Sequence, residues 1–129
     1  MNNLNQRSID NLKNVHPDLV RLIEEAIKTT SIDFVVTEGM RTLARQRELV
    51  RAGASQTMRS RHLTGHAVDL ACIVKGKLRW DWPLYEKLAK HIKEVAKVQN
   101  ISIEWGGDWT TFKDGPHYQL SWAEYKYEK

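Results

Sequence analysis

The segment AVDLACIV, residues 67–74, places one charged side chain inside an otherwise apolar run. A short run of apolar and β-branched residues favours a buried strand. Because side chains alternate along a strand, Val68, Leu70 and Cys72 are expected to face the core. Asp69 then faces the other way, between two alanines. Burying a carboxylate without a cation or hydrogen-bond donors is costly, so Asp69 is expected to contact either a metal ion or backbone donors.

The rest of the chain mixes helix and strand patterns, which predicts an α+β domain. Helices are expected over residues 16–30, 42–53 and from Pro83 onward, and strands over 33–39, 67–74, 101–105 and 116–120. In the last strand, His117 and Gln119 share one face. The segments 54–65 and 106–115 are expected to be irregular, and KGK to form a turn. The first six and last four residues are expected to be disordered, with a short helical end beginning at Ser121.

A chain of 129 residues fits one domain, and no linker separates a second one. The lone cysteine, Cys72, cannot form an internal disulfide and suits a reducing cytoplasm. No signal peptide is evident, and no run approaches the roughly 20 apolar residues of a membrane span. We therefore expect no membrane insertion.

Positive charge is concentrated in one segment of the chain. The net charge is +4, and six arginines lie between Arg41 and Arg61. Such a cluster is typical either of a solvated helix face or of a surface that attracts a polyanion, whether cell envelope or nucleic acid. Nucleic-acid binding is disfavoured because the segment lacks the interleaved aromatic residues of a stacking platform.

Two short fragments, SRHLTGHAVD at 60–69 and DGPHYQL at 114–120, contain the candidate metal ligands. A catalytic zinc site takes three ligands from His, Asp, Glu or Cys and keeps a fourth position for water. A loop histidine, His62, and two strand residues, Asp69 and His117, can supply such a set. The sequence therefore predicts that these three side chains hold one Zn²⁺ ion.

Other acids and histidines near these fragments receive different interpretations. Asp114 precedes His117 by three residues, where it can act as a general base or merely cap a turn. His66 lies on the strand face opposite the carboxylate and is expected to have a structural role. His16 precedes a proline at a helix start and is expected to serve local structure, whereas His91 is expected to face solvent.

The two fragments together resemble the D-Ala-D-Ala metallopeptidase group. SRHLTGHAVD fits the signature S-x-H-x-x-G-x-A-x-D, and DGPH fits the second motif, an acid three residues before the last ligand. VVTEGMRT and EWGGDW extend the similarity over nearly the whole chain. The group includes D,D-carboxypeptidases and phage L-alanyl-D-glutamate endopeptidases, and it shares its fold with the hedgehog signalling domain. The resemblance implies a small antiparallel sheet flanked by helices.

The resemblance also implies roles for individual residues. It assigns the zinc ligands as above, makes Asp114 the catalytic acid and places Arg41 against the substrate. Ser60 occupies the serine position of the signature, where a site-shaping role is implied. Trp109, just after the GGD turn, is our candidate for a wall of the cleft. An aspartate at 114, where many members have glutamate, favours the endolysin type.

The implied function is a zinc-dependent peptidoglycan hydrolase, an endolysin that cleaves the L-Ala–D-Glu bond. The alternatives are a D-Ala-D-Ala carboxypeptidase or dipeptidase, and a non-catalytic module that binds cell wall. We expect a monomer over residues 1–129, without a separate wall-binding domain. It would be made in the host cytoplasm and act on the wall after a holin-type pore protein opens the membrane.

Overall fold

A five-stranded antiparallel sheet is built around the segment that carries Asp69. The computed structural model describes residues 2–55, 57, 59–111 and 113–126. The strands are β1 (Asp33–Glu38), β2 (Ala67–Val74), β3 (Lys77–Arg79), β4 (Ile103–Trp105) and β5 (His117–Leu120). They lie in the order β1-β2-β5-β4, and β3 pairs with the distal half of β2. The predicted α+β class is therefore confirmed.

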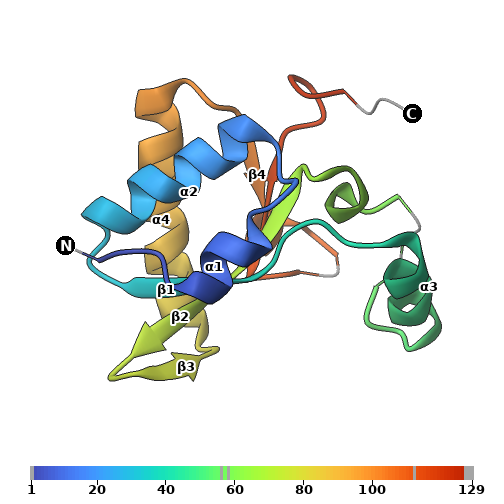
Figure 1. Cartoon of the computed structure of the whole chain (residues 1–129), viewed down its shortest axis with the longest axis horizontal. Coiled ribbons are helices and arrows are strands. Elements are labelled where there is room, and N and C mark those ends of the chain that lie inside the picture. Colours follow the sequence, from blue (N-terminus) through green and yellow to red (C-terminus); the bar gives the residue numbers. More distant parts are fainter. Residues whose placement is uncertain (1, 56, 58, 112, 127–129) are drawn as a thin grey trace.

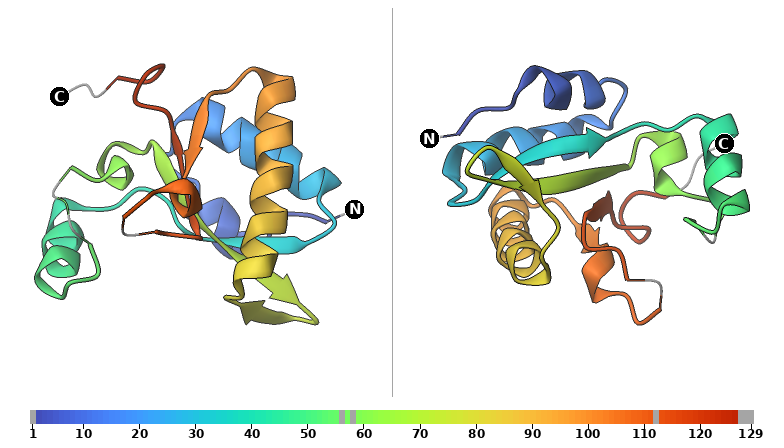
Figure 2. Two further views of the ribbon diagram at one scale, coloured as in Figure 1. Left: turned by 180° about the vertical axis from the view of Figure 1, so that it is seen from behind. Right: turned by 90° about the horizontal axis from the view of Figure 1, so that it is seen from below.

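Helices α2 (Pro17–Thr29) and α4 (Trp82–Gln99) lie together on the hydrophobic core, whereas α3 (Leu43–Arg51) lies apart from them (Figure 1). A further helix is α1 (Gln6–Asn11), and the 3-10 turns are η1 (Arg61–Thr64) and η2 (Gly106–Asp108). Helices α2 and α4 pack against each other and share one hydrophobic core with the strands. Helix α3 lies at the opposite end of the molecule from α4 (Figure 1). The view from below in Figure 2 shows the same separation.

The alternation predicted for β2 is observed. Val68, Leu70 and Cys72 are fully buried in the core shared with α2 and α4, and Cys72 is a free thiol. Asp69 is only partly buried, and it belongs to the opposite face. The predicted apolar stripe of α2 is also buried throughout: Leu19, Leu22, Ile23, Ala26 and Ile27.

Both ends of the chain differ from their predictions. Residues 2–6 are described, and Asn5 caps α1 by accepting a hydrogen bond from the Ser8 amide at 2.8 Å. The Ser8 hydroxyl in turn accepts from the Val36 amide at 2.8 Å, which ties α1 to β1. Residues 121–126 form turns instead of the predicted helix, and the Tyr125 hydroxyl donates to Asp18 at 2.7 Å. Residues 127–129 of the predicted tail lie outside the described residues.

Three smaller predictions also need correction. The turn after β2 is shorter than KGK, because Lys75 and Gly76 adopt positive φ and Lys77 already begins β3. His91 does not simply face solvent: its Nε2 lies 3.2 Å from the Ala26 carbonyl oxygen, so it bridges α4 to α2. The segment 54–65 contains η1. Among the described residues, no helix is long and apolar enough to cross a membrane.

Candidate active site

Three side chains from two strands and one turn converge as the sequence predicted. Ligand atoms of His62, Asp69 and His117 all lie within 4.8 Å of one another. Asp69 Oδ1 is 3.2 Å from His62 Nε2 and 3.3 Å from His117 Nδ1. Tetrahedral zinc with bonds of about 2.0–2.1 Å separates neighbouring ligand atoms by about 3.3 Å. The group can therefore hold a metal ion.

The backbone explains why these side chains meet. Asp69 and His117 are direct partners in the antiparallel pairing of β2 with β5, so they project from the same face of the sheet. His62 belongs to η1, whose first turn is capped by the Ser60 hydroxyl accepting from the His62 amide at 3.2 Å. Gly65 ends η1 with φ 75°, and a Cβ there would lie 2.4 Å from the Asn14 carbonyl oxygen. Glycine is required at this position.

The second nitrogen of each imidazole has its own partner. His62 Nδ1 lies 2.8 Å from the Gly39 carbonyl oxygen, which can only accept, so Nδ1 carries the proton and Nε2 is left for a metal. His117 Nε2 lies 2.7 Å from Gln119 Oε1, which leaves Nδ1 toward Asp69. Partners of this kind fix the orientation of metal-binding histidines.

The carboxylate of Asp69 is stabilised in its charged form. Burial alone would raise the pKa of Asp69, but its contacts with the His117 and His62 rings outweigh burial and hold that pKa well below its ordinary value. Arg41 Nη2 adds a positive charge 3.9 Å from Asp69 Oδ2. An ionised carboxylate is the form that binds metal.

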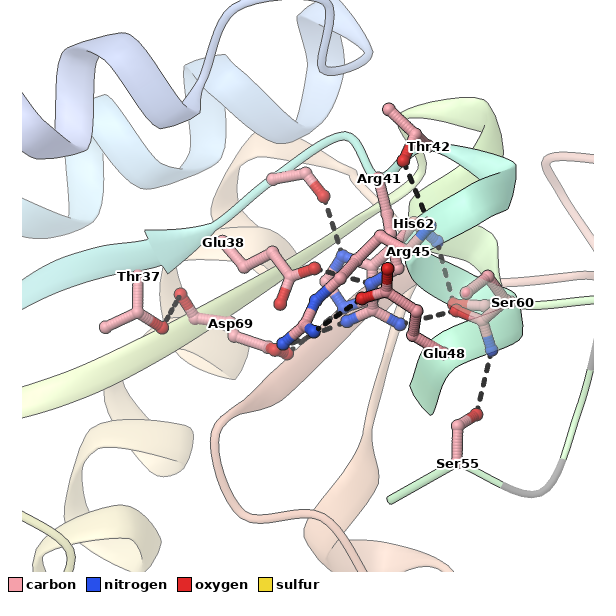
Figure 3. A network of polar contacts seen from close by, with 12 residues as sticks. Thr37, Glu38, Arg41, Thr42, Arg45, Glu48, Ser55, Ser60, His62 and Asp69 are labelled. Carbon is pink, nitrogen blue, oxygen red and sulfur yellow. Dashed lines mark hydrogen bonds and ion pairs between the residues drawn. The ribbon is translucent and has the colours of Figure 1, made fainter. Parts of the chain in front are cut away.

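Arg41 is held in place on both sides, and Figure 3 shows its side chain beside Glu38 and Asp69. Its Nε donates to Glu38 Oε1 at 2.5 Å, and its Nη1 donates to Gln46 Oε1 at 2.7 Å. Gln46 is fully buried, and its Nε2 donates to the Ser55 hydroxyl at 2.9 Å and to the Thr57 carbonyl oxygen at 2.5 Å. The network leaves Nη2 of Arg41 beside Asp69. Sequence reasoning missed both partners of Arg41.

Asp114 lies in a turn formed by backbone atoms. Its amide donates to the Gly106 carbonyl oxygen at 3.0 Å, and its carbonyl oxygen accepts from the His117 amide at 3.2 Å. Within the described ranges its carboxylate forms no hydrogen bond, so the turn does not depend on a side-chain cap. Burial and then the negative charge of Asp69 raise the pKa of Asp114 above its ordinary value.

A cleft of about 970 Å³ passes over these groups. One wall comes from the segment around α3 and the other from the loop after η2. The cleft is lined by every residue that the sequence singled out for the site: Arg41, Ser60, His62, Asp69, Trp109, Asp114 and His117. The ring centroid of Trp109 is 5.1 Å from that of His117.

The remaining histidines lie outside the metal group. His66 is not one of its members; His66 Nδ1 lies 2.7 Å from the Thr64 hydroxyl, and its ring is 5.3 Å from that of His16. His16 caps α2, as its position before proline predicted, because its Nδ1 accepts from the Asp18 amide at 3.1 Å.

Comparison with known proteins identifies the family of this chain. Residues 1–120 match the family described as phage L-alanyl-D-glutamate peptidase. The L-alanyl-D-glutamate peptidase of Listeria phage A118 is 43% identical over 98 residues, which cover 76% of this chain and 34% of that protein. The chain thus spans about a third of the length of that relative.

Two further relatives match over most of their length. Peptidoglycan L-alanyl-D-glutamate endopeptidase CwlK of Bacillus subtilis is 31% identical over 123 residues, covering 82% of this chain and 73% of that protein. The crystal structure of Serratia marcescens L-Ala D-Glu endopeptidase ChiX is 52% identical, with a TM-score of 0.88 over 93% of this chain and 90% of that one. The chain therefore belongs to the phage L-alanyl-D-glutamate peptidase family and has the fold of ChiX.

Proposed function

We propose that this protein is a zinc-dependent peptidoglycan hydrolase that cleaves the bond between L-Ala and D-Glu in the stem peptide. The observation that carries the proposal is the convergence of His62, Asp69 and His117 in one cleft with Asp114 and Arg41. Membership of the L-alanyl-D-glutamate peptidase family supports the choice of bond.

The donor set fits zinc. Two imidazoles and one carboxylate are a usual ligand set for catalytic zinc, and the distances of 3.2 and 3.3 Å agree with tetrahedral coordination. Bound there, zinc would polarise the scissile carbonyl group and make a water molecule acidic enough to attack at neutral pH.

The protein's own residues have separate tasks in the hydrolysis. Asp114 lines the cleft beside His117 and would accept a proton from the attacking water, then pass it to the departing amine of D-Glu. Arg41 is fixed by two acceptors and presents Nη2 toward the ligands, where it would stabilise negative charge on the carbonyl oxygen. Water is thereby added across the amide without net proton uptake.

Two residues would shape the site and contact the substrate. Ser60 positions His62 through its cap of η1, and this contact is the physical basis for its proposed role. Trp109 is half-buried against the His117 ring and would supply an apolar wall for the stem peptide. For the cell, we propose synthesis in the host cytoplasm and release to the wall through a holin-type pore, as membership of a phage lysin family suggests.

Digestion of purified sacculi tests the activity and the bond. Mass spectrometry of the products should show a new amino terminus on D-Glu, and metal analysis should find one zinc per chain. Protein stripped of metal should be inactive and regain activity with zinc. Release of free D-Ala would instead identify a carboxypeptidase or dipeptidase, and wall binding without new termini would identify a non-catalytic module.

A further inference from the structure

Behind His117 a line of polar side chains runs across two strands. Gln119 follows on the same face of β5, and Glu104 is its direct partner on β4. His117 Nε2 lies 2.7 Å from Gln119 Oε1, and Gln119 Nε2 lies 3.4 Å from Glu104 Oε1. Both Gln119 and His117 are at least 95% buried, so neither can exchange these partners freely for water.

Glu104 determines which way the Gln119 amide points. A carboxylate only accepts hydrogen bonds, so it attracts the amide NH₂ group and repels the amide oxygen. The other carboxylate oxygen of Glu104 accepts from the Trp122 amide at 3.1 Å, which restrains rotation of the carboxylate. The Gln119 oxygen must therefore face His117.

The orientation of Gln119 in turn determines the position of a proton on His117. An amide oxygen 2.7 Å from Nε2 requires hydrogen on Nε2, so a neutral ring has its lone pair on Nδ1. Nδ1 is the atom 3.3 Å from Asp69 Oδ1, inside the metal group. We infer that Glu104 and Gln119 are positioning residues that keep His117 in the tautomer able to bind metal. The inference rests on the proposed metal site but not on which peptide bond is cleaved.

The opposite tautomer shows what this arrangement prevents. With the Gln119 amide reversed, His117 would carry its proton on Nδ1 and donate it to Asp69, which would occupy the carboxylate oxygen needed for metal. His62 needs no such device, because its second nitrogen contacts the Gly39 backbone carbonyl. Of the two imidazoles, only that of His117 has its proton position determined by other side chains.

Removal of the acceptor is the first test. Gln119→Leu leaves a buried N–H without a partner, and metal affinity should fall about 10–100-fold, as measured by competition with a chelator. Glu94→Gln, on an exposed position of α4, is the matched control and should bind zinc like the wild type. Wild-type affinity in a folded Gln119→Leu variant would overturn the inference.

A sharper test exchanges the carboxylate of Glu104 with the amide of Gln119, which preserves the size and the net charge of the pair. Glu104→Gln alone lets the Gln119 amide adopt both orientations, so about half of the molecules should lose the competent tautomer and metal affinity should fall about twofold. Combining Glu104→Gln with Gln119→Glu again places an acceptor beside His117 and a donor at position 104. The double variant should bind zinc better than Glu104→Gln.

Nitrogen-15 NMR of the His117 ring gives a readout that a merely structural role would not move. At a pH where the ring is neutral, the metal-free wild type and the double variant should show the proton on Nε2, and Glu104→Gln should show a mixture. A wild-type proton on Nδ1, or a double variant no better than Glu104→Gln, would contradict the assignment. These outcomes are independent of wall digestion, so failure of the proposed peptidase activity would be recognised separately.

Discussion

Gly106 is the position where a single methyl group should disturb catalysis most selectively. It begins η2 and lies against the turn that carries Asp114 and His117. A Cβ at Gly106 would lie 2.3 Å from the Asp114 carbonyl oxygen, 3.0 Å from Asp114 Cβ and 3.1 Å from His117 Cβ. The nearest of these atoms belongs to the backbone and cannot rotate away, so Gly106→Ala must displace the turn.

The size of the effect follows from these distances. Moving the Asp114 carbonyl oxygen from 2.3 Å to the 3.0 Å limit for real Cβ contacts requires a shift of about 0.7 Å. Inserting a carbon into a packed site costs about 1–3 kcal/mol in unfolding free energy. Displacement of a catalytic group by nearly 1 Å can lower turnover about 100-fold. We therefore expect Gly106→Ala to lower both the free energy of unfolding and the turnover.

The assay compares turnover of a soluble muropeptide with stability in urea and with zinc affinity. Gly76→Ala is the control, because Gly76 has φ 77° with open space around it, so alanine there should cost about 1–2 kcal/mol without touching the site. Its turnover should remain that of the wild type. If Gly106→Ala lost stability to the same extent as Gly76→Ala but kept full turnover, the role given to the Asp114 turn would be refuted.

Four further outcomes are expected. Asp114→Asn should retain its fold and zinc, but its turnover should fall by at least about 100-fold, because the amide cannot accept the water's proton. Activity on muropeptide equal to that of the wild type would exclude a catalytic base at this position. Gln46→Leu should destabilise the protein by about 1–3 kcal/mol in urea and lower turnover, since Arg41 loses a buried acceptor; an unchanged urea midpoint would contradict this. Burial raises the pKa of the Cys72 thiol to about 11, so native protein at pH 9 should resist iodoacetamide whereas unfolded protein reacts. The unfolded chain releases this proton near pH 9, so the free energy of unfolding should fall as pH rises from 9 to 11.

The three residues of the candidate metal site could be predicted because each had a local signature. Strand alternation placed Asp69 opposite a core face, and residue chemistry with the family signature selected His62 and His117. The partners of these residues had no such signature. Gln46 is a polar residue among arginines on a predicted helix, and only the folded structure shows that it is fully buried against Arg41.

The errors at the chain ends have a related cause. The polar first six residues predict disorder when they are judged by composition, yet Asn5 among them caps α1, and the Ser8 hydroxyl ties that helix to β1. Tyr125 likewise forms its hydrogen bond with Asp18, 107 residues away in sequence. Hydrogen bonds between residues far apart in sequence determine the structure of both ends of the chain. Local sequence patterns contain no information about such hydrogen bonds.

One side of the cleft is a packed sheet, and the other side is α3 with the polar segment after it. This difference should separate substitutions that affect catalysis from those that affect substrate binding. Asp69 and His117 are paired residues of a packed sheet, so the distance between them is set by strand register before any metal binds. The opposite wall comes from α3 and the polar segment after it, joined to Arg41 through Gln46. Loops on a rigid scaffold vary and move more easily than the scaffold does. Substitutions on the sheet side should therefore act on metal binding and kcat, whereas those on the α3 side that leave Gln46 and Arg41 intact should act on KM and on the choice of stem peptide.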